Sequence, residues 1–323
     1  MALTIWTNGI FTPAATQLLH EGTSAHEIVT SVRASGSVLN AGETDGAFQM
    51  ADVAFGQPSV SDCLANQRLK WVEVTSAGYT RYDTSEFSKT FCARKAILTN
   101  ASGVFADPCA QHVLAMMLAF ARQILPSHRD QLTDQSWHYD ERRYHSRLLT
   151  GQTVLMLGFG AIGRRLAELL TPFHVRSLAF RRRATVSSEV QIVAEAELAE
   201  ALGLADHVVN ILPDNPSTER FMGPERFSQM KPGARFYNVG RGTTVDQGAL
   251  VAALRSGSLG AAYLDVTVPE PLPPDHALWT APNCFITPHT AGGRHDQDEA
   301  LVRHFLANLA CFEKGQELRD RVV

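Results

Sequence analysis

Short apolar runs alternate with polar helical patterns along the first third of the chain. Segments 13–20 and 59–67 have the spacing of amphipathic helices, and each lies between two runs that have the composition of strands. Strands and helices that alternate in this way form a parallel sheet. The predicted strands are residues 3–6, 28–32, 52–55 and 69–74.

The pattern changes near Asn100. Asp107 can cap the amino end of a helix that has Pro108 at its first position, and residues 109–125 are then almost continuously apolar. We expect this helix to be largely buried. A helix rich in Leu, Met and Ala more often packs domains or subunits together than it binds a cofactor.

A second alternating series begins at Thr153 and predicts one doubly wound sheet of six strands. After Gly292 a final helix is expected to run to about residue 312, and its apolar face should pack on the first domain. The predicted strands are residues 153–157, 175–180, 207–212, 234–239, 261–266 and 284–287. The apolar face comprises Val302, Phe305, Leu306, Leu309 and Phe312.

Composition excludes several classes of protein. The 323 residues are 45% hydrophobic and 19% charged, which is typical of a folded protein rather than a disordered or membrane-spanning one. A net charge of −4 without a dense basic face argues against nucleic acid as a partner. Five scattered cysteines have no metal-ligand spacing, and the first residues do not resemble a secretory signal. We therefore expect a cytoplasmic protein without a metal site.

A glycine-rich loop follows the first strand of the second series. Residues 153–157 run into Gly158-Phe159-Gly160-Ala161-Ile162-Gly163 and then into a helical pattern, which is the order that a dinucleotide-binding loop requires. Gly158 permits the tight turn, Gly160 lets the backbone approach a pyrophosphate, and Gly163 lets the helix lie close to the strand. The amides of Ala161 and Ile162 lie at the helix start, where phosphates bind.

The whole pattern predicts an α/β fold of two Rossmann-like or flavodoxin-like domains with parallel sheets, since the chain is longer than one core usually covers. One domain comprises residues 1–99 and 290–323. The dinucleotide-binding domain, residues 100–289, is inserted in it.

Three arginines follow the second strand of the dinucleotide-binding domain. A domain selective for NAD places an acid here, against the ribose 2′-hydroxyl. This chain has Arg181, Arg182 and Arg183 instead, which form either a solvated turn or a site for the 2′-phosphate of NADP. The missing acid favours NADP, with NAD possible at lower efficiency.

Several short motifs together resemble the D-isomer-specific 2-hydroxyacid dehydrogenases, in particular the glyoxylate and hydroxypyruvate reductases. The motifs occur in family order and cover essentially the whole chain. They are Ser76-Ala77-Gly78, Thr99-Asn100-Ala101-Ser102-Gly103-Val104, Asn238-Val239-Gly240-Arg241-Gly242, Leu264-Asp265-Val266, Pro269-Glu270-Pro271 and Thr287-Pro288-His289-Thr290-Ala291-Gly292.

The resemblance implies three catalytic residues, and their chemistry suits the reduction of a 2-keto acid. Arg241 would hold the carboxylate and polarise the ketone, and His289 would give a proton to the developing alkoxide. Glu270 would bond the second ring nitrogen of His289 and favour the imidazolium form. Each of the three follows a predicted strand, at the carboxyl edge where ligands of such sheets bind.

The resemblance also implies binding residues. The amides of Ala77 and Gly78 would contact the substrate carboxylate, and Pro213 and Gly240 would line the cofactor cleft. Asp265 would contact the nicotinamide carboxamide or, alternatively, cap a helix or loop. Asn210 departs from the smaller residue common in relatives and could change the cofactor pocket, and Gln247 stands where many relatives have Glu.

The predicted function is an NADP-preferring reductase of glyoxylate, hydroxypyruvate or a similar small keto acid, which forms the D-hydroxy acid. The resemblance further implies that residues 1–99 and 290–323 bind the substrate, that the two domains close over it, and that residues 109–125 form a homodimer. One alternative is a relative that acts on formate or phosphite. Another is a cofactor-sensing binding protein of the corepressor type on the same fold.

Overall fold

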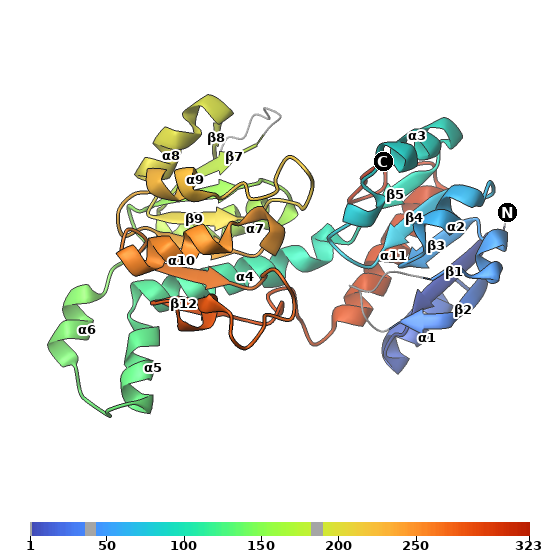
Figure 1. Cartoon of the computed structure of the whole chain (residues 1–323). Coiled ribbons are helices and arrows are strands. Elements are labelled where there is room, and N and C mark those ends of the chain that lie inside the picture. Colours follow the sequence, from blue (N-terminus) through green and yellow to red (C-terminus); the bar gives the residue numbers. More distant parts are fainter. Residues whose placement is uncertain (1, 36–42, 182–189) are drawn as a thin grey trace. The chain divides into compact units, whose positions relative to one another are not determined.

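A computed structural model describes residues 2–35, 43–181 and 190–323. The chain forms two compact units (Figure 1). Unit 1 comprises Met1–Phe105 and Arg294–Val323, and unit 2 is the inserted segment Ala106–Gly293. The inserted segment begins and ends a few residues after the positions expected from the sequence.

Unit 1 is built on a five-stranded parallel sheet in the order β2-β1-β3-β4-β5, which is the flavodoxin-like order. All four predicted strands are present. The strands are β1 (Thr4–Gly9), β2 (Glu27–Ser35), β3 (Val53–Gly56), β4 (Trp71–Val74) and β5 (Ile97–Thr99). The helices are α1 (Pro13–Gly22), α2 (Val60–Ala65), α3 (Ser85–Arg94) and α11 (Gln297–Glu313).

The apolar face of α11 packs on the sheet of unit 1, as the sequence predicts. The ring of Phe305 stacks on Phe55 and Trp71, with centroids 4.3 and 5.1 Å apart. Phe312 also stacks on Trp71, at 5.5 Å. The C-terminal helix thus packs in the core of the same unit as the N-terminal strands.

Unit 2 contains a seven-stranded parallel sheet in the order β12-β11-β10-β9-β6-β7-β8. The six predicted strands are present, and β8 is an additional, three-residue edge strand that its short length concealed. The strands are β6 (Thr153–Leu157), β7 (Arg176–Phe180), β8 (Gln191–Val193), β9 (His207–Asn210), β10 (Arg235–Asn238), β11 (Ala261–Leu264) and β12 (Cys284–Ile286). The helices are α5 (Ile124–Leu132), α6 (Tyr139–His145), α7 (Ala161–Leu170), α8 (Leu198–Leu204), α9 (Pro224–Gln229) and α10 (Gln247–Ser256).

The long apolar helix, α4 (Ser102–Ala121), differs from the prediction. It starts before Asp107, so Pro108 lies inside the helix and Asp107 does not cap it. Asp107 instead accepts a hydrogen bond from Arg165 Nε at 2.5 Å. The helix ends at Ala121 because Gln123 has a left-handed backbone (φ 59°), and α5 follows.

The exposure of α4 is also greater than predicted. Val113 and Met117 are fully buried, but Leu114, Met116 and Leu118 are only partly covered. By length and composition alone α4 could cross a membrane, a property that it shares with core helices of globular domains.

Candidate active site

The predicted catalytic residues follow adjacent strands of unit 2. Arg241 comes after β10 and His289 after β12, while Glu270 lies in the loop after β11. The three strands are neighbours and parallel, with Leu264 paired to both Asn238 and Ile286. Their following loops therefore lie at one edge of the sheet, where ligands of doubly wound folds bind.

His289 and Glu270 are in contact. Nδ1 of His289 lies 2.8 Å from Oε2 of Glu270, and Oε1 of Glu270 accepts the amide N–H of Thr267 at 3.0 Å. Because a carboxylate can only accept, Nδ1 carries the hydrogen of this bond. No described residue bonds to Nε2 of His289, so this nitrogen can hold the proton that reacts.

The charge of Glu270 suits this role. Partial burial by itself raises the pKa of this carboxyl, but the hydrogen bonds from His289 and from the Thr267 amide outweigh burial and lower the pKa below its usual value. Glu270 is thus ionised at neutral pH, and as an anion it accepts the hydrogen bond from Nδ1 of His289.

Asp265 shapes the loop that carries His289. Its carboxylate is buried and accepts four hydrogen bonds, one from the Thr287 hydroxyl (2.6 Å), one from the Thr290 amide (2.8 Å) and two from the Ala291 amide (both 3.0 Å). Its backbone carbonyl accepts the His289 amide at 2.8 Å. Asp265 therefore caps this loop from both sides of His289, which has a left-handed backbone at φ 55°.

The Arg241 loop is braced by a residue whose role the sequence did not reveal. Asn210 is fully buried in β9, and its Nδ2 donates to Asn238 Oδ1 (3.0 Å) and to the Thr244 hydroxyl oxygen (2.6 Å). Both partners donate in turn to the backbone carbonyl of Arg241, at 3.1 and 2.6 Å. Asn210 thus fixes the loop on which the arginine sits, rather than simply enlarging or reducing a pocket. Gln247 bonds the backbone of Val268 through both ends of its amide.

The glycine loop fits a dinucleotide. Gly158 has φ 99°, and a Cβ there would lie 3.1 Å from the Ile211 carbonyl oxygen, while a Cβ on Gly163 would lie 2.9 Å from the Gly158 carbonyl oxygen. A Cβ on Gly160 would meet nothing, so this side of the loop is open. The first helical bond of α7 is that from the Arg164 amide to Gly160. The amides of Ala161 and Ile162, in the first turn of α7, have no acceptor within the helix and are available to a phosphate.

Other predicted cofactor residues lie around this loop. The Gly158 amide donates to the Phe180 carbonyl at 3.1 Å, which places the exposed Arg181 beside the loop. Arg182 and Arg183 lie outside the described residues. Gly240 lies against the Leu212 backbone, next to Pro213, because its Cβ would approach the Leu212 carbonyl oxygen to 2.8 Å. Ala77 and Gly78 follow β4 in unit 1, with both residues partly exposed.

Comparison with known proteins identifies similar sequences and structures. A model of the NAD binding domain of D-isomer specific 2-hydroxyacid dehydrogenases matches residues 114–291. Human glyoxylate reductase/hydroxypyruvate reductase is 31% identical over 260 residues, which are 79% of this chain and 77% of the human protein. Glyoxylate reductase of Pyrococcus furiosus is 30% identical over 256 residues, 77% of this chain and 74% of that protein.

The fold is similar to that of solved structures over its whole length. The D-isomer specific 2-hydroxyacid dehydrogenase from Xanthobacter autotrophicus Py2, solved with NADPH and MES, has a TM-score of 0.82 and 25% identity, with 100% of this chain and 98% of that chain covered. An NAD-dependent formate dehydrogenase from Staphylococcus aureus, at 20% identity, shares the fold with a TM-score of 0.69 over 99% of this chain and 98% of its own.

Proposed function

Because the chain belongs to the D-isomer-specific 2-hydroxyacid dehydrogenases, NAD(P)-dependent enzymes that act on CH–OH groups, we propose that it reduces glyoxylate, hydroxypyruvate or a similar small 2-keto acid with NADPH. The product of a prochiral keto acid would be the D-hydroxy acid. The observation that carries this proposal is the 2.8 Å contact between His289 and Glu270 at the strand edge that also holds Arg241.

The reaction needs a proton, a binding site for the carboxylate and a hydride. Nε2 of the His289 imidazolium would donate the proton to the oxygen of the ketone, and Glu270 would stabilise the cation before the transfer. The Arg241 guanidinium would bind the carboxylate and polarise the carbonyl, together with the amides of Ala77 and Gly78. A reduced nicotinamide, held by the glycine loop, supplies the hydride when bound.

The preference for NADPH rests on Arg181 and Arg182. Arg181, rather than an acid, directly follows β7, and a guanidinium forms charge-assisted bonds to a 2′-phosphate. The Xanthobacter relative was solved with NADPH, which agrees with this choice. The substrate class is supported by relatives that are named glyoxylate or hydroxypyruvate reductases.

A substrate screen tests the proposed function. The decrease of NADPH and NADH absorbance is followed with glyoxylate, hydroxypyruvate and larger 2-keto acids, and the glycerate formed from hydroxypyruvate is separated by chiral chromatography. We expect turnover with NADPH, D-glycerate as the product, and loss of turnover in His289→Ala.

Three results would contradict the proposal. They are no reduction of any 2-keto acid, mostly L-glycerate, or reduction that His289→Ala leaves unchanged. The parallel assay with formate or phosphite and the oxidised cofactors tests the alternative activity on the same fold. NADPH binding without turnover on any of these substrates would favour a cofactor-sensing protein.

We further propose that the enzyme is a homodimer in which α4 and the segment after it contact a second copy. In the part of unit 2 around α5 and α6 (Figure 1), four large side chains are at least 66% exposed. Such exposure on neighbouring elements is typical of an interface. The side chains are Leu132 (71%), Trp137 (91%), Tyr144 (74%) and Leu148 (66%).

Light scattering with size exclusion tests the dimer. The wild type should have twice the mass of one chain, and the double variant Trp137→Glu/Tyr144→Glu should be monomeric. The matched variant Trp279→Glu changes an exposed tryptophan elsewhere in unit 2 and should stay dimeric. A monomeric wild type would refute the proposal.

A further inference from the structure

The loop of residues 76–78 is anchored through its carbonyl groups. The Ala101 amide donates to the Ser76 carbonyl at 3.0 Å, and Asn100 Nδ2 donates to the Ala77 carbonyl at 2.8 Å. In a trans peptide the C=O and N–H groups point in opposite directions. Anchoring these two carbonyls therefore fixes the directions of the Ala77 and Gly78 N–H groups. Neither N–H group donates to another described residue.

Asn100 is itself fixed at both ends. Its Oδ1 accepts the Ser102 amide at 3.1 Å, which sets the side-chain orientation so that Nδ2 is directed at Ala77. Its backbone amide donates to the Asp320 carbonyl at 3.1 Å. Oδ2 of Asp320 accepts the amide of Gly103 at 2.6 Å. Asp320 thus binds the backbone on both sides of the segment that anchors the loop.

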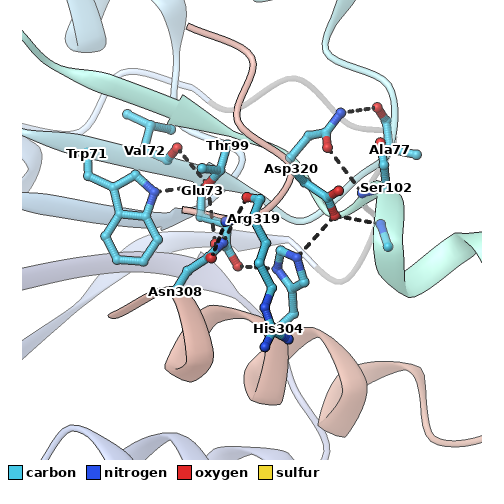
Figure 2. A network of polar contacts seen from close by, with 12 residues as sticks. Trp71, Val72, Glu73, Ala77, Thr99, Ser102, His304, Asn308, Arg319 and Asp320 are labelled. Carbon is cyan, nitrogen blue, oxygen red and sulfur yellow. Dashed lines mark hydrogen bonds and ion pairs between the residues drawn. The ribbon is translucent and has the colours of Figure 1, made fainter. Parts of the chain in front are cut away.

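A chain of charged side chains, buried or partly buried, holds Asp320 in place (Figure 2). His304 bridges two acids, with Nε2 3.1 Å from Asp320 Oδ2 and Nδ1 3.0 Å from Glu73 Oε1. Glu73 is 1% exposed, and its other oxygen accepts Asn308 Nδ2 at 2.7 Å and the Thr99 hydroxyl at 3.2 Å. Glu73 lies in β4, which leads directly into the loop of residues 76–78.

The charge state of His304 strengthens this arrangement. Burial by itself lowers the pKa of the imidazole, but hydrogen bonds and charges from Asp320 and Glu73 outweigh burial and raise the pKa to about 9. At neutral pH His304 is therefore protonated, and its two ring nitrogens donate to the Asp320 and Glu73 carboxylates.

Stabilisation of the core alone does not account for this network. Desolvating buried charges costs about as much as their attraction returns, and apolar side chains of similar volume often stabilise a core as well. What the network does provide is a fixed position for each member, and its last member is the side chain that orients the Gly78 amide.

We propose that Asn100 is a positioning residue for the substrate carboxylate, and that Asp320, His304 and Glu73 hold Asn100 in place. This inference rests on the proposed reduction of a 2-keto acid. According to this inference, residues far apart in the sequence together orient the two amide donors that bind one carboxylate group.

Substitution of Asn100 tests the inference, with the substrate charge as the variable. Asn100→Asp keeps the acceptor for Ser102 but replaces the donor to Ala77 by an oxygen, and Asn100→Ala removes both. Each variant is assayed with glyoxylate and with its methyl ester, which lacks the carboxylate charge, at saturating NADPH. Asp320→Asn tests the support of Asn100 in the same way.

We expect the KM for glyoxylate to rise about tenfold in both Asn100 variants, because a bond to a charged group is weakened. The KM for the ester should change less, so the preference for acid over ester falls. Asp320→Asn should also raise the KM for glyoxylate and lower the preference for acid over ester, each by a smaller factor. The dissociation constant of NADPH, measured by fluorescence, should not change.

Asp52→Asn is the matched control. Asp52 is a buried carboxylate of the same unit that accepts the Thr4 amide at 3.1 Å and pairs with Lys70 at 3.1 Å. It precedes β3 and so lies at the opposite edge of the sheet from residues 76–78. Its replacement should lower thermal stability and leave the preference for glyoxylate over its methyl ester unchanged.

The outcomes separate the inference from the proposed function. An active wild type whose Asn100 variants slow acid and ester equally, as a general loss of structure would, overturns the inference alone. A wild type that reduces no 2-keto acid overturns the proposed function and the inference with it. A lowered preference for glyoxylate over its methyl ester in both Asn100 variants, with NADPH binding retained, supports the inference.

Discussion

Replacing Gly242 by Ala should separate two parts of the active site without removing any functional group. Gly242 follows Arg241 and is packed against the backbone of Thr267, whose amide donates to Glu270. A Cβ on residue 242 would lie 2.1 Å from the Thr267 carbonyl oxygen and 2.2 Å from its carbonyl carbon. Neither atom belongs to a flexible side chain, so one of the two loops must move.

The size of the movement gives the size of the effect. Real Cβ atoms essentially never approach such atoms closer than 3.0 Å, so the backbones must separate by about 1 Å, a displacement that typically costs about 100-fold in rate. Arg241 lies on one of these loops and Glu270 on the other. We therefore expect kcat/KM for glyoxylate to fall about 100-fold.

The assay compares this variant with Gly203→Ala. Gly203 lies in α8, and a Cβ there would have one neighbour, the Gln229 carbonyl oxygen, at an ordinary 3.6 Å. Alanine inside a helix stabilises by about 0.5–1 kcal/mol relative to glycine, so this control should be active and slightly more stable. NADPH binding shows that Gly242→Ala is folded. Wild-type kcat/KM in folded Gly242→Ala would refute the argument that this close packing positions the site.

Four further predictions concern single residues. Arg181→Asp should lower kcat/KM with NADPH about tenfold more than with NADH, because a charge-assisted contact is lost, and equal use of both cofactors by the wild type would contradict the assignment. His289→Ala should lower kcat in both directions by about 10²–10⁴ with NADPH binding retained, and near-normal turnover would assign the proton to another residue. Glu270→Gln should lower kcat for reduction, because the imidazole loses the carboxylate that accepts its Nδ1 hydrogen, and an unchanged kcat would argue against the pairing. Burial, assisted by the charge of Arg235, lowers the pKa of His207 from 6.5 to about 3, so the unfolded chain takes up a proton between these values that the folded chain does not. The free energy of unfolding, measured in urea, should therefore fall by on the order of 1 kcal/mol per pH unit below pH 6.5, and a His207→Gln variant with the same slope would refute this.

The predicted fold rests on strands whose apolar runs are long enough to stand out. The strands that the pattern missed, β5 and β8, have three residues each, too few for a periodicity to be visible. β12 is as short, but Pro282 and Pro288 mark its two ends in the sequence. The start of α4 was misplaced because Asp107-Pro108 is a frequent beginning of a helix. In this chain the helix begins earlier, at Ser102, and the Asp107 carboxylate pairs with Arg165.

The contacts of the candidate site also differ in how far the sequence reveals them. The His289–Glu270 contact joins residues only 19 positions apart, each of them in a recognisable motif, and could be predicted from the motifs. The support of Gly103 by Asp320 spans 217 positions, and Asp320 belongs to none of the motifs, so only the fold reveals this contact. Asp265 shows a third situation, in which the residue is evident from its motif but its four hydrogen bonds to the His289 loop are not.

His207 and His304 both have a shifted pKa, but they lie at opposite edges of their sheets. His207 is kept neutral by burial and starts β9, where Tyr237 (2.8 Å) and Gln152 (2.6 Å) satisfy both ring nitrogens at the amino edge of the sheet of unit 2. His304 is charged, and through Asp320 it supports a loop at the carboxyl edge of the sheet of unit 1. A shifted pKa is common to both, but parallel sheets bind ligands only at the carboxyl edge. A substitution of His207 should therefore change stability alone, whereas disturbing the His304 network should change substrate binding as well.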